Sequence, residues 1–325
     1  MTTLPRRRLG KSELSISTVG FGAWAIGGGG WSYGWGDQDD ASSVAAIVHA
    51  VSRGVSWLDT AAIYGLGHSE EVIGRALREL PASQRPLVFT KCGLLAPANP
   101  HDSPVRNLTL ASMRRELEAS LRRLGLERID LYQIHWPDTS TGTAIEDSWG
   151  EMARFVDEGK VRAIGVSNFD VTLLERCEAI RHVDSIQPPL SLIERDAGRD
   201  VIPWAAQRGT GVLVYSPLQS GILTERFSAE RARSLPAEDW RRRSEHFNEP
   251  QLSRNVALRD ALRPIALRHQ SSVSAVAIAW AASFPGVTGA IVGGRSPAQV
   301  DGWIAGASLE LTPQDRADIA AALKA

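Results

Sequence analysis

The sequence has few cysteines and few lysines, and each shortage excludes something. Cys92 and Cys177 are the only cysteines in 325 residues, too few for a disulfide framework or a multi-cysteine metal site. The seven histidines show no pair at the spacing of metal ligands, so we expect no metal. This cysteine usage is typical of a reducing compartment and predicts a cytoplasmic protein.

The sequence also lacks an excess of either charge and any long apolar run. The formal net charge is -1 at pH 7, which gives no basis for nucleic acid or an anionic membrane as a partner. No run reaches membrane-spanning length, and the basic N-terminal stretch has no apolar segment behind it. We therefore expect neither a signal peptide nor a membrane anchor, and a small molecule as the ligand.

What the sequence contains is a regular alternation of short β-rich runs with longer amphipathic segments. This pattern is typical of strand-helix units around a parallel sheet. Eight strands are expected at residues 18–21, 57–59, 87–90, 131–135, 163–167, 185–187, 211–215 and 289–292. Because no Pro/Ser-rich linker separates them, they favour an α/β fold: a single (β/α)₈ TIM barrel domain over residues 1–325, with an N-terminal β-hairpin.

Three segments between the strands carry more specific expectations. Apolar residues at helical spacing predict a helix over residues 110–124, with Thr109 as its N-cap and Gly125 as its C-cap. Ser69 is expected to cap another helix, with Glu70 near its positive end. The long charged stretch at residues 224–255, which follows the seventh strand and includes three consecutive arginines at 241–243, fits a solvated loop or a lid over a bound cofactor.

Polar side chains end most of the predicted strands, on the face where barrel enzymes keep their active sites. These residues are Asp59, Lys91, His135, Ser167, Asn168, Gln187 and Tyr215. Lys91 is notable among them, because only four of the 36 basic residues are lysines.

Four of the residues near these strand ends could perform one reaction together. Tyr64 is a poor acid at its ordinary pKa of about 10, and the ammonium group of Lys91 would lower that pKa. Asp59 would keep Lys91 charged, and neutral His135 could hydrogen-bond a substrate oxygen. A tuned phenol beside a carbonyl oxygen is what reduction by hydride requires, and hydride transfer needs a nicotinamide cofactor.

Five stretches of the chain resemble segments of the aldo-keto reductase superfamily, in order and over nearly the whole length. They are "GVSWLDTAAIYGLGHSEEVIGRAL", "SLRRLGLERIDLYQIHWP", "GKVRAIGVSNF", "YSPLQSGIL" and "IVGGRSPAQV". The resemblance is closest to bacterial members. It implies that Asp59, Tyr64, Lys91 and His135 form a catalytic tetrad, with Tyr64 as the acid in reduction and the base in oxidation.

The resemblance also implies which residues hold the cofactor. They are Gly22, Trp24, Ser167, Asn168, Gln187 and Tyr215 around the nicotinamide, Ser216, Leu218 and Gly221 along the pyrophosphate, and Arg295, Ser296 and Gln299 at the adenosine. Many members place a lysine where this chain has Gly293, so a 2'-phosphate would depend chiefly on Arg295. Because arginine suits phosphate, NADPH is favoured, and NADH stays open.

A glycine-rich stretch, "GAWAIGGGGWSYGWGDQDD", follows the first predicted strand. It lacks the Gly-Lys-Ser/Thr that a phosphate loop requires. Its aromatic residues could instead wall a substrate pocket, with simple surface packing as the alternative. The expected pocket residues are Trp24, Trp31, Tyr33, Trp35 and Trp136.

The sequence therefore predicts an NADPH-dependent reductase of aldehydes and ketones. A short-chain dehydrogenase is excluded, because none of the four tyrosines has a lysine four residues later. A nicotinamide-binding regulatory barrel with little turnover remains the alternative. The identity of the substrate, the physiological direction and the oligomeric state do not follow from the sequence.

Overall fold

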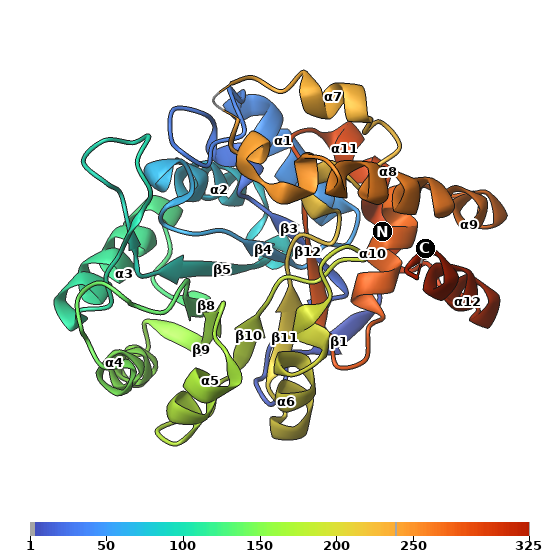
Figure 1. The fold of residues 1–325 in the computed structure, drawn as a ribbon. Coiled ribbons are helices and arrows are strands. Elements are labelled where there is room, and N and C mark those ends of the chain that lie inside the picture. Colours follow the sequence, from blue (N-terminus) through green and yellow to red (C-terminus); the bar gives the residue numbers. More distant parts are fainter. Residues whose placement is uncertain (1–3, 238, 325) are drawn as a thin grey trace.

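The computed structural model describes residues 4–237 and 239–324 and confirms the predicted barrel (Figure 1). Eight parallel strands close in the order β10, β11, β12, β3, β4, β5, β8, β9. Their bounds are Val19–Gly22 (β3), Trp57–Asp59 (β4), Leu87–Cys92 (β5), Ile129–Ile134 (β8), Val161–Ser167 (β9), Ser185–Gln187 (β10), Gly211–Val214 (β11) and Gly289–Gly293 (β12). Each predicted strand is present, with its ends displaced by at most two residues.

Helices surround these strands (Figure 1). Their bounds are Asp40–Ser52 (α1), His68–Glu79 (α2), Leu110–Leu124 (α3), Ile145–Asp157 (α4), Val171–Glu178 (α5), Val201–Arg208 (α6), Ala229–Arg233 (α7), Gln251–Ala261 (α8), Arg263–Arg268 (α9), Val273–Ala282 (α10), Pro297–Trp303 (α11) and Pro313–Ala322 (α12). None of the helices found in the described part of the chain is both long and apolar enough to cross a membrane.

Two predicted helix caps behave differently from expectation. Thr109 precedes α3 as predicted, but its hydroxyl donates to Asn107 and does not cap the helix, whereas Gly125 closes α3 in the left-handed region at φ 68°. Ser69 is not the N-cap of α2, because the helix begins at His68 and Gly67, at φ 106°, is its N-cap. Ser69 is buried within the first turn, where its hydroxyl bonds to neighbouring strands.

The predicted N-terminal hairpin plugs one end of the barrel. Strands β1 (Arg6–Arg8) and β2 (Ser15–Ser17) pair antiparallel, and the apolar residues between and within them pack against Trp57 inside the barrel. A Cβ on Gly20 would lie only 2.2 Å from the Trp57 ring, so that ring requires glycine beside it. Each large apolar side chain buried here contributes about 1.5–3 kcal/mol to stability.

Strand alternation divides the barrel interior into two layers. Trp57, Phe89 and Leu131 belong to the apolar layer above the hairpin plug. Because alternate residues of a strand share a face, the residues two positions further along also point inward, and these are Asp59, Lys91 and Gln133. The barrel is therefore apolar at the plugged end and polar at the carboxyl ends of its strands.

The segment after β11 is folded, which argues against the solvated-loop interpretation. It contains α7, a 3₁₀ turn at Trp240–Arg243, and its own apolar cluster of Ile222, Phe227, Ala232, Leu235, Phe247 and Leu252. Arg259 of α8, which is only 4% exposed, donates to the Phe227 carbonyl at 2.5 Å and the Thr224 carbonyl at 3.0 Å. In Figure 1, α7 lies on the side of the barrel that carries α1 and α11.

Candidate active site

The four predicted catalytic residues come together at the open end of the barrel. Asp59 ends β4, Lys91 lies within β5, and His135 follows β8 directly. Tyr64 lies in the 3₁₀ turn that leads from β4 into α2. Neighbouring strands thus place three of these side chains, and a tight turn places the fourth.

Lys91 and Asp59 form a buried ion pair. The Lys91 Nζ lies 2.5 Å from the Asp59 Oδ1, and the two side chains are 0% and 4% exposed. Lys91 also donates to the Thr60 carbonyl at 2.9 Å. Burial lowers the pKa of Lys91, and the Asp59 carboxylate opposes that shift. A buried charge of this kind is stable only with its partner in place.

The second oxygen of Asp59 connects the pair to two glutamines. Gln187 donates from Nε2 to the Asp59 Oδ2 at 2.9 Å and to the Gln133 Oε1 at 3.3 Å. The sequence analysis did not single out Gln133. It could have been found from strand alternation, because Leu131, Gln133 and His135 fall on one face of the same run.

Tyr64 reaches the ion pair because its turn is unusually tight. Gly65 and Leu66 both have positive φ, and a Cβ on Gly65 would lie 2.1 Å from the Gly27 carbonyl oxygen. The Tyr64 ring then lies 5.6 Å from the His135 ring at an angle of 81°. The Lys91 Nζ is 5.3 Å from the centre of the same phenol ring.

The protonation states differ in one respect from the expectation. Burial and the nearby Lys91 charge hold the pKa of His135 well below its usual value, so the imidazole is neutral as predicted. For Tyr64, however, burial and the Asp59 and Tyr215 side chains raise the pKa well above 10, whereas the sequence argument predicted a lowering. The Lys91 charge is offset by Asp59 at 2.5 Å, and burial disfavours the phenolate.

The residues predicted to hold the nicotinamide are already linked to one another. The Ser167 hydroxyl donates to the Gln187 carbonyl at 2.8 Å, and the Tyr215 hydroxyl donates to the Asn168 Oδ1 at 2.8 Å. Asn168 donates to the His135 carbonyl at 2.9 Å and has a φ of 62°. This polar group therefore joins the ends of β8, β9, β10 and β11, and its amides suit a carboxamide.

The backbone after β11 turns tightly through several residues with positive φ. Ser216, Gln219, Ser220 and Gly221 have φ values of 55°, 44°, 53° and 98°. The Gln219 and Gly221 amides donate within the turn, to the Ser216 and Leu218 carbonyls at 2.9 and 3.0 Å. The predicted pyrophosphate residues Ser216, Leu218 and Gly221 lie in this turn. Gly22, predicted to lie near the cofactor, pairs with Gly293 at the end of the neighbouring strands.

The predicted adenosine residues lie at the start of α11. Ser296 caps this helix through the Gln299 amide, and the Gln299 side chain accepts from the Arg295 amide at 2.9 Å. The Arg295 guanidinium donates to Gln38 and to the carbonyls of Trp35 and Asp37, all neutral groups. Burial lowers the pKa of Arg295, and the neighbouring Arg241 charge lowers it further, while the Asp37 carboxylate opposes the shift.

Arg241 is thus not part of a simple solvated charge run. Its guanidinium lies 4.8 Å from the centre of the Trp35 ring and pairs with Asp239 at 2.6 Å. Arg243 donates to the Ser32 carbonyl at 3.1 Å, which ties the segment after β11 to the loop after β3. Sequence reasoning missed the contacts of Arg241 with Trp35 and of Arg243 with Ser32, because they join residues more than 200 positions apart.

Trp24, Trp35 and Trp240 form what we call the tryptophan cluster. Trp24 stacks on Tyr64 at 6.1 Å and on Trp240 at 5.1 Å, while Trp35 packs edge-on against both tryptophans at 5.4 and 5.6 Å. Two of its members were predicted pocket residues, and Trp240 was not.

The other predicted pocket residues lie in two places. Trp31 packs edge-on against Tyr33 at 6.0 Å, and both belong to a small apolar cluster with Ala61 and Ile63. Trp136 instead packs beneath the guanidinium of Arg106, 5.0 Å from the centre of its ring. The glycine-rich loop therefore places Trp24 on the Tyr64 ring and Tyr33 in the same apolar cluster, whereas Trp136 lies with a different neighbour.

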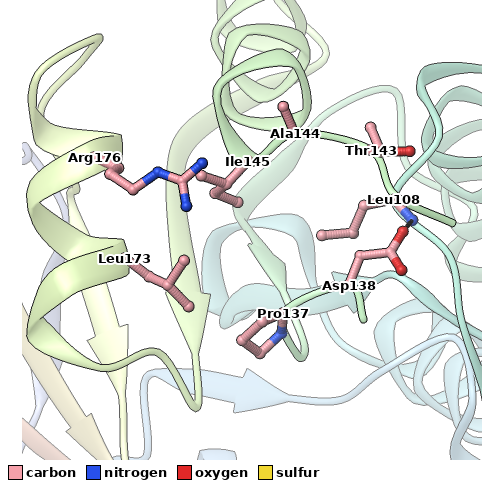
Figure 2. Close-up of a pocket in the computed structure, with 8 residues that line it drawn as sticks. All are labelled: Leu108, Pro137, Asp138, Thr143, Ala144, Ile145, Leu173 and Arg176. Carbon is pink, nitrogen blue, oxygen red and sulfur yellow. Dashed lines mark hydrogen bonds between the residues drawn. The ribbon is translucent and has the colours of Figure 1, made fainter. Parts of the chain in front are cut away.

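A separate cavity of about 120 Å³ lies beside α5, as Figure 2 shows. It is lined by Leu108, Pro137, Asp138, Thr143, Ala144, Ile145, Leu173 and Arg176. Its two charged groups are already paired: Asp138 accepts from the Leu108 amide, and Arg176 donates twice to Glu146. This cavity offers no group free for chemistry. Across the described residues, no three His, Cys, Asp or Glu side chains gather as a metal site.

Comparison with known proteins agrees with the geometry. The sequence profile of the Aldo/keto reductase family matches residues 18–324. The chain is 33% identical over 307 residues to aldo-keto reductase YhdN of Bacillus subtilis, covering 94% of this chain and 89% of that protein. It is 30% identical over 316 residues to the NADH-specific methylglyoxal reductase of Escherichia coli, covering 94% of each.

Solved structures are also similar. The glycerol dehydrogenase AKR11B4 from Gluconobacter oxydans superposes with a TM-score of 0.87 at 36% sequence identity, covering 98% of this chain and 94% of that one.

Proposed function

The chain belongs to the aldo/keto reductase family, and we propose that it reduces aldehydes or ketones to alcohols with Tyr64 as the proton donor. The observation that carries this proposal is the buried Lys91–Asp59 pair, 2.5 Å long, beside Tyr64 and a neutral His135. The phenol of Tyr64 and the imidazole of His135 therefore lie beside each other at the open end of the barrel. Both can hydrogen-bond one carbonyl oxygen.

The protonation states support reduction in particular. Because burial raises the pKa of Tyr64, its hydroxyl keeps its proton at neutral pH and can deliver it to a developing alkoxide. Neutral His135 can donate a hydrogen bond to the same oxygen without competing as an acid. When bound, a reduced nicotinamide supplies the hydride that the protein itself cannot carry.

The cofactor that we propose is NADPH. Arg295 and Arg241 lie close enough for one charge to affect the other, yet Arg295 donates only to neutral oxygens. Among the described residues, Arg241 pairs with Asp239, whereas no carboxylate forms an ion pair with Arg295, whose positive charge is opposed from a distance by Asp37. A 2'-phosphate would offset that charge, and arginine binds phosphate well.

The proposed reaction is tested with a substrate panel followed by nicotinamide absorbance, in both directions and with both cofactors. The panel includes methylglyoxal and glycerol, after the activities named for the relatives. In Tyr64→Phe, turnover should fall by about 10²–10⁴-fold, the usual contribution of a positioned acid, while NADPH still binds. A fully active Tyr64→Phe enzyme would refute the mechanism. Tight NADPH binding without turnover on any carbonyl would favour a regulatory barrel.

The cofactor preference is tested separately by calorimetry. NADPH should bind more tightly than NADH, and Arg295→Ala and Arg241→Ala should each narrow that gap. Arg242→Ala is the matched control, because Arg242 is exposed and, among the described residues, its side chain donates to the Leu235 carbonyl alone. Equal affinities in the parent protein would refute the preference for NADPH.

A further inference from the structure

Glu70 is completely buried on the outer side of β5, although it occupies the first turn of a helix. Its side chain is 0% exposed. The Thr90 hydroxyl donates to its Oε1 at 2.6 Å, and the Arg123 Nε donates to its Oε2 at 2.7 Å. A solvated carboxylate would serve the helix dipole equally well, and burying one is costly. The dipole therefore does not explain the burial of Glu70.

The adjacent residue, Ser69, bonds to the other strands at this side of the barrel. Its hydroxyl donates to the Ala23 carbonyl at 2.8 Å and shares a 2.8 Å hydrogen bond with the Thr60 hydroxyl. Ala23 follows β3, and Thr60 follows β4. Together with the bond from Thr90 of β5 to Glu70, these contacts attach one helical turn to three consecutive strands.

These attachment points lie next to the predicted catalytic residues. Thr90 immediately precedes Lys91, and strand alternation points the two side chains to opposite faces of β5. Thr60 immediately follows Asp59, and its carbonyl accepts from the Lys91 Nζ at 2.9 Å. The first turn of α2 therefore fixes both members of the ion pair from behind the strands.

The same turn also fixes Tyr64. The 3₁₀ turn Tyr64–Gly67 runs directly into α2, so any movement of Glu70 would be transmitted to the phenol. Arg123 covers this junction, since a Cβ on Gly67 would lie 3.0 Å from the Arg123 Cδ. Arg123 thus contacts Glu70 with its guanidinium and Gly67 with its aliphatic stem.

We propose that Glu70, held by Arg123, is a positioning residue that fixes Tyr64 relative to the Lys91–Asp59 pair. This inference rests on the proposed function, because it assumes that Tyr64 and Lys91 act together. Glu70 itself touches no substrate and acts through Thr90 and the turn before α2.

The negative charge of Glu70 also affects the pKa of Lys91. Burial lowers the pKa of Lys91, while Asp59 and, more weakly, Glu70 raise it. The other charged groups facing Glu70 are Arg123 and Glu116 of α3, and burial raises the pKa of Glu116 to about 7, with Glu70 adding to that shift. Removing the charge of Glu70 while keeping its shape should therefore lower the pKa of Lys91.

The test compares Glu70→Gln with Glu151→Gln in the full-length protein. Glu151, on α4, is a matched control, because its side chain is 2% exposed and pairs with Arg114 and Arg154. Both variants should lose thermal stability. Only Glu70→Gln should lower kcat for carbonyl reduction, by about tenfold as expected for a small misplacement of a catalytic group, and shift the alkaline limb of the pH profile to lower pH. The KM for NADPH should stay within twofold of the parent value, at about the error of such measurements.

Two further measurements test the positioning role of Glu70 if Glu70→Gln folds poorly or the parent shows no turnover. Thr90→Val removes only the hydrogen bond to β5 and should lower kcat in the same direction. Replacing Lys11, Lys160 and Lys324 with Arg leaves Lys91 as the one lysine, whose ¹³Cε shift reports its titration without any substrate. Addition of Glu70→Gln should then move that titration to lower pH.

The outcomes separate the two proposals. If the parent protein reduces no carbonyl, the proposed function is refuted, whatever the result of the Lys91 titration. An active parent whose Glu70→Gln variant keeps its kcat, its pH profile and the Lys91 titration overturns the positioning role and leaves Glu70 as a purely structural residue. A Lys91 titration shifted to lower pH, together with a lowered kcat, supports the positioning role of Glu70.

Discussion

The strand-end residues and the tryptophan cluster lie side by side but are built in different ways. Lys91, Asp59 and Gln187 come from separate strands of one barrel, are almost fully buried, and are linked by hydrogen bonds of 2.5–2.9 Å. Trp24 and Trp240 come from loops more than 200 residues apart and are held by ring stacking at 5.1 Å. The first region cannot move without disrupting the sheet, whereas the second can open locally.

This difference assigns the chemistry to the strand ends and the access of substrate to the loops. The groups proposed to handle the proton are attached to the barrel, whereas Trp24, which stacks on Tyr64, and Trp240, which stacks on Trp24, belong to two loops. Arg295 reinforces the loop side, because its guanidinium donates to carbonyls of the loop after β3. We therefore expect changes at the strand ends to alter kcat and global stability together, and changes in the tryptophan cluster to alter binding while stability changes little.

The largest effect that would sharpen this comparison is expected for Lys91→Met. The substitution leaves the Asp59 carboxylate buried without its partner, which should cost about 3–5 kcal/mol of unfolding free energy. Denaturant unfolding measures the loss, and carbonyl reduction should be nearly abolished in the same variant. The double variant with Asp59→Asn should recover part of the stability but none of the activity. If Lys91→Met is as stable as the parent, the ion pair does not hold the strand ends together.

A second effect should appear on the outer side of β5, at Glu116. This carboxyl accepts from the Gly93 amide at 2.9 Å, and burial raises its pKa to about 7. Because the folded state binds this proton more tightly than the unfolded state, the contribution of Glu116 is full below about pH 4.5 and declines as the pH rises to about 7.

The size of that decline follows from the shift. A raised pKa of about 7 corresponds to a loss of about 3 kcal/mol across this window in the parent protein. The difference in unfolding free energy between pH 5 and pH 8 should therefore be smaller in Glu116→Gln than in the parent. The same difference in both proteins would show that another group is responsible.

Much of this molecule could be predicted from its sequence because it is built on local periodicity. The eight strands follow from alternating runs, and the convergence of Asp59, Lys91 and His135 follows from the parallel strands that they end or follow. Three properties could not be predicted: the stacking of Trp240 on Trp24, the burial of Glu70, and the raised pKa of Tyr64. Each depends on how distant segments pack, and no local pattern records such packing.

The smallest effect is expected for Trp240→Ala. This variant is also the most direct test of the difference between the strand-end residues and the tryptophan cluster. Loss of its stacking on Trp24 and of its edge-on contact with Trp35 should cost about 0.5–1.5 kcal/mol per aromatic pair, confined to the loops. Global stability and kcat should change little, while the KM for small carbonyls rises severalfold and bulkier carbonyls become better substrates. Trp280→Ala is a useful control, because among the ring pairs of the described residues Trp280 packs edge-on against Phe284 alone, on the outside of the barrel. If Trp240→Ala instead lowers kcat as much as Tyr64→Phe does, the cluster positions the phenol directly, and chemistry is not separated from access in this barrel.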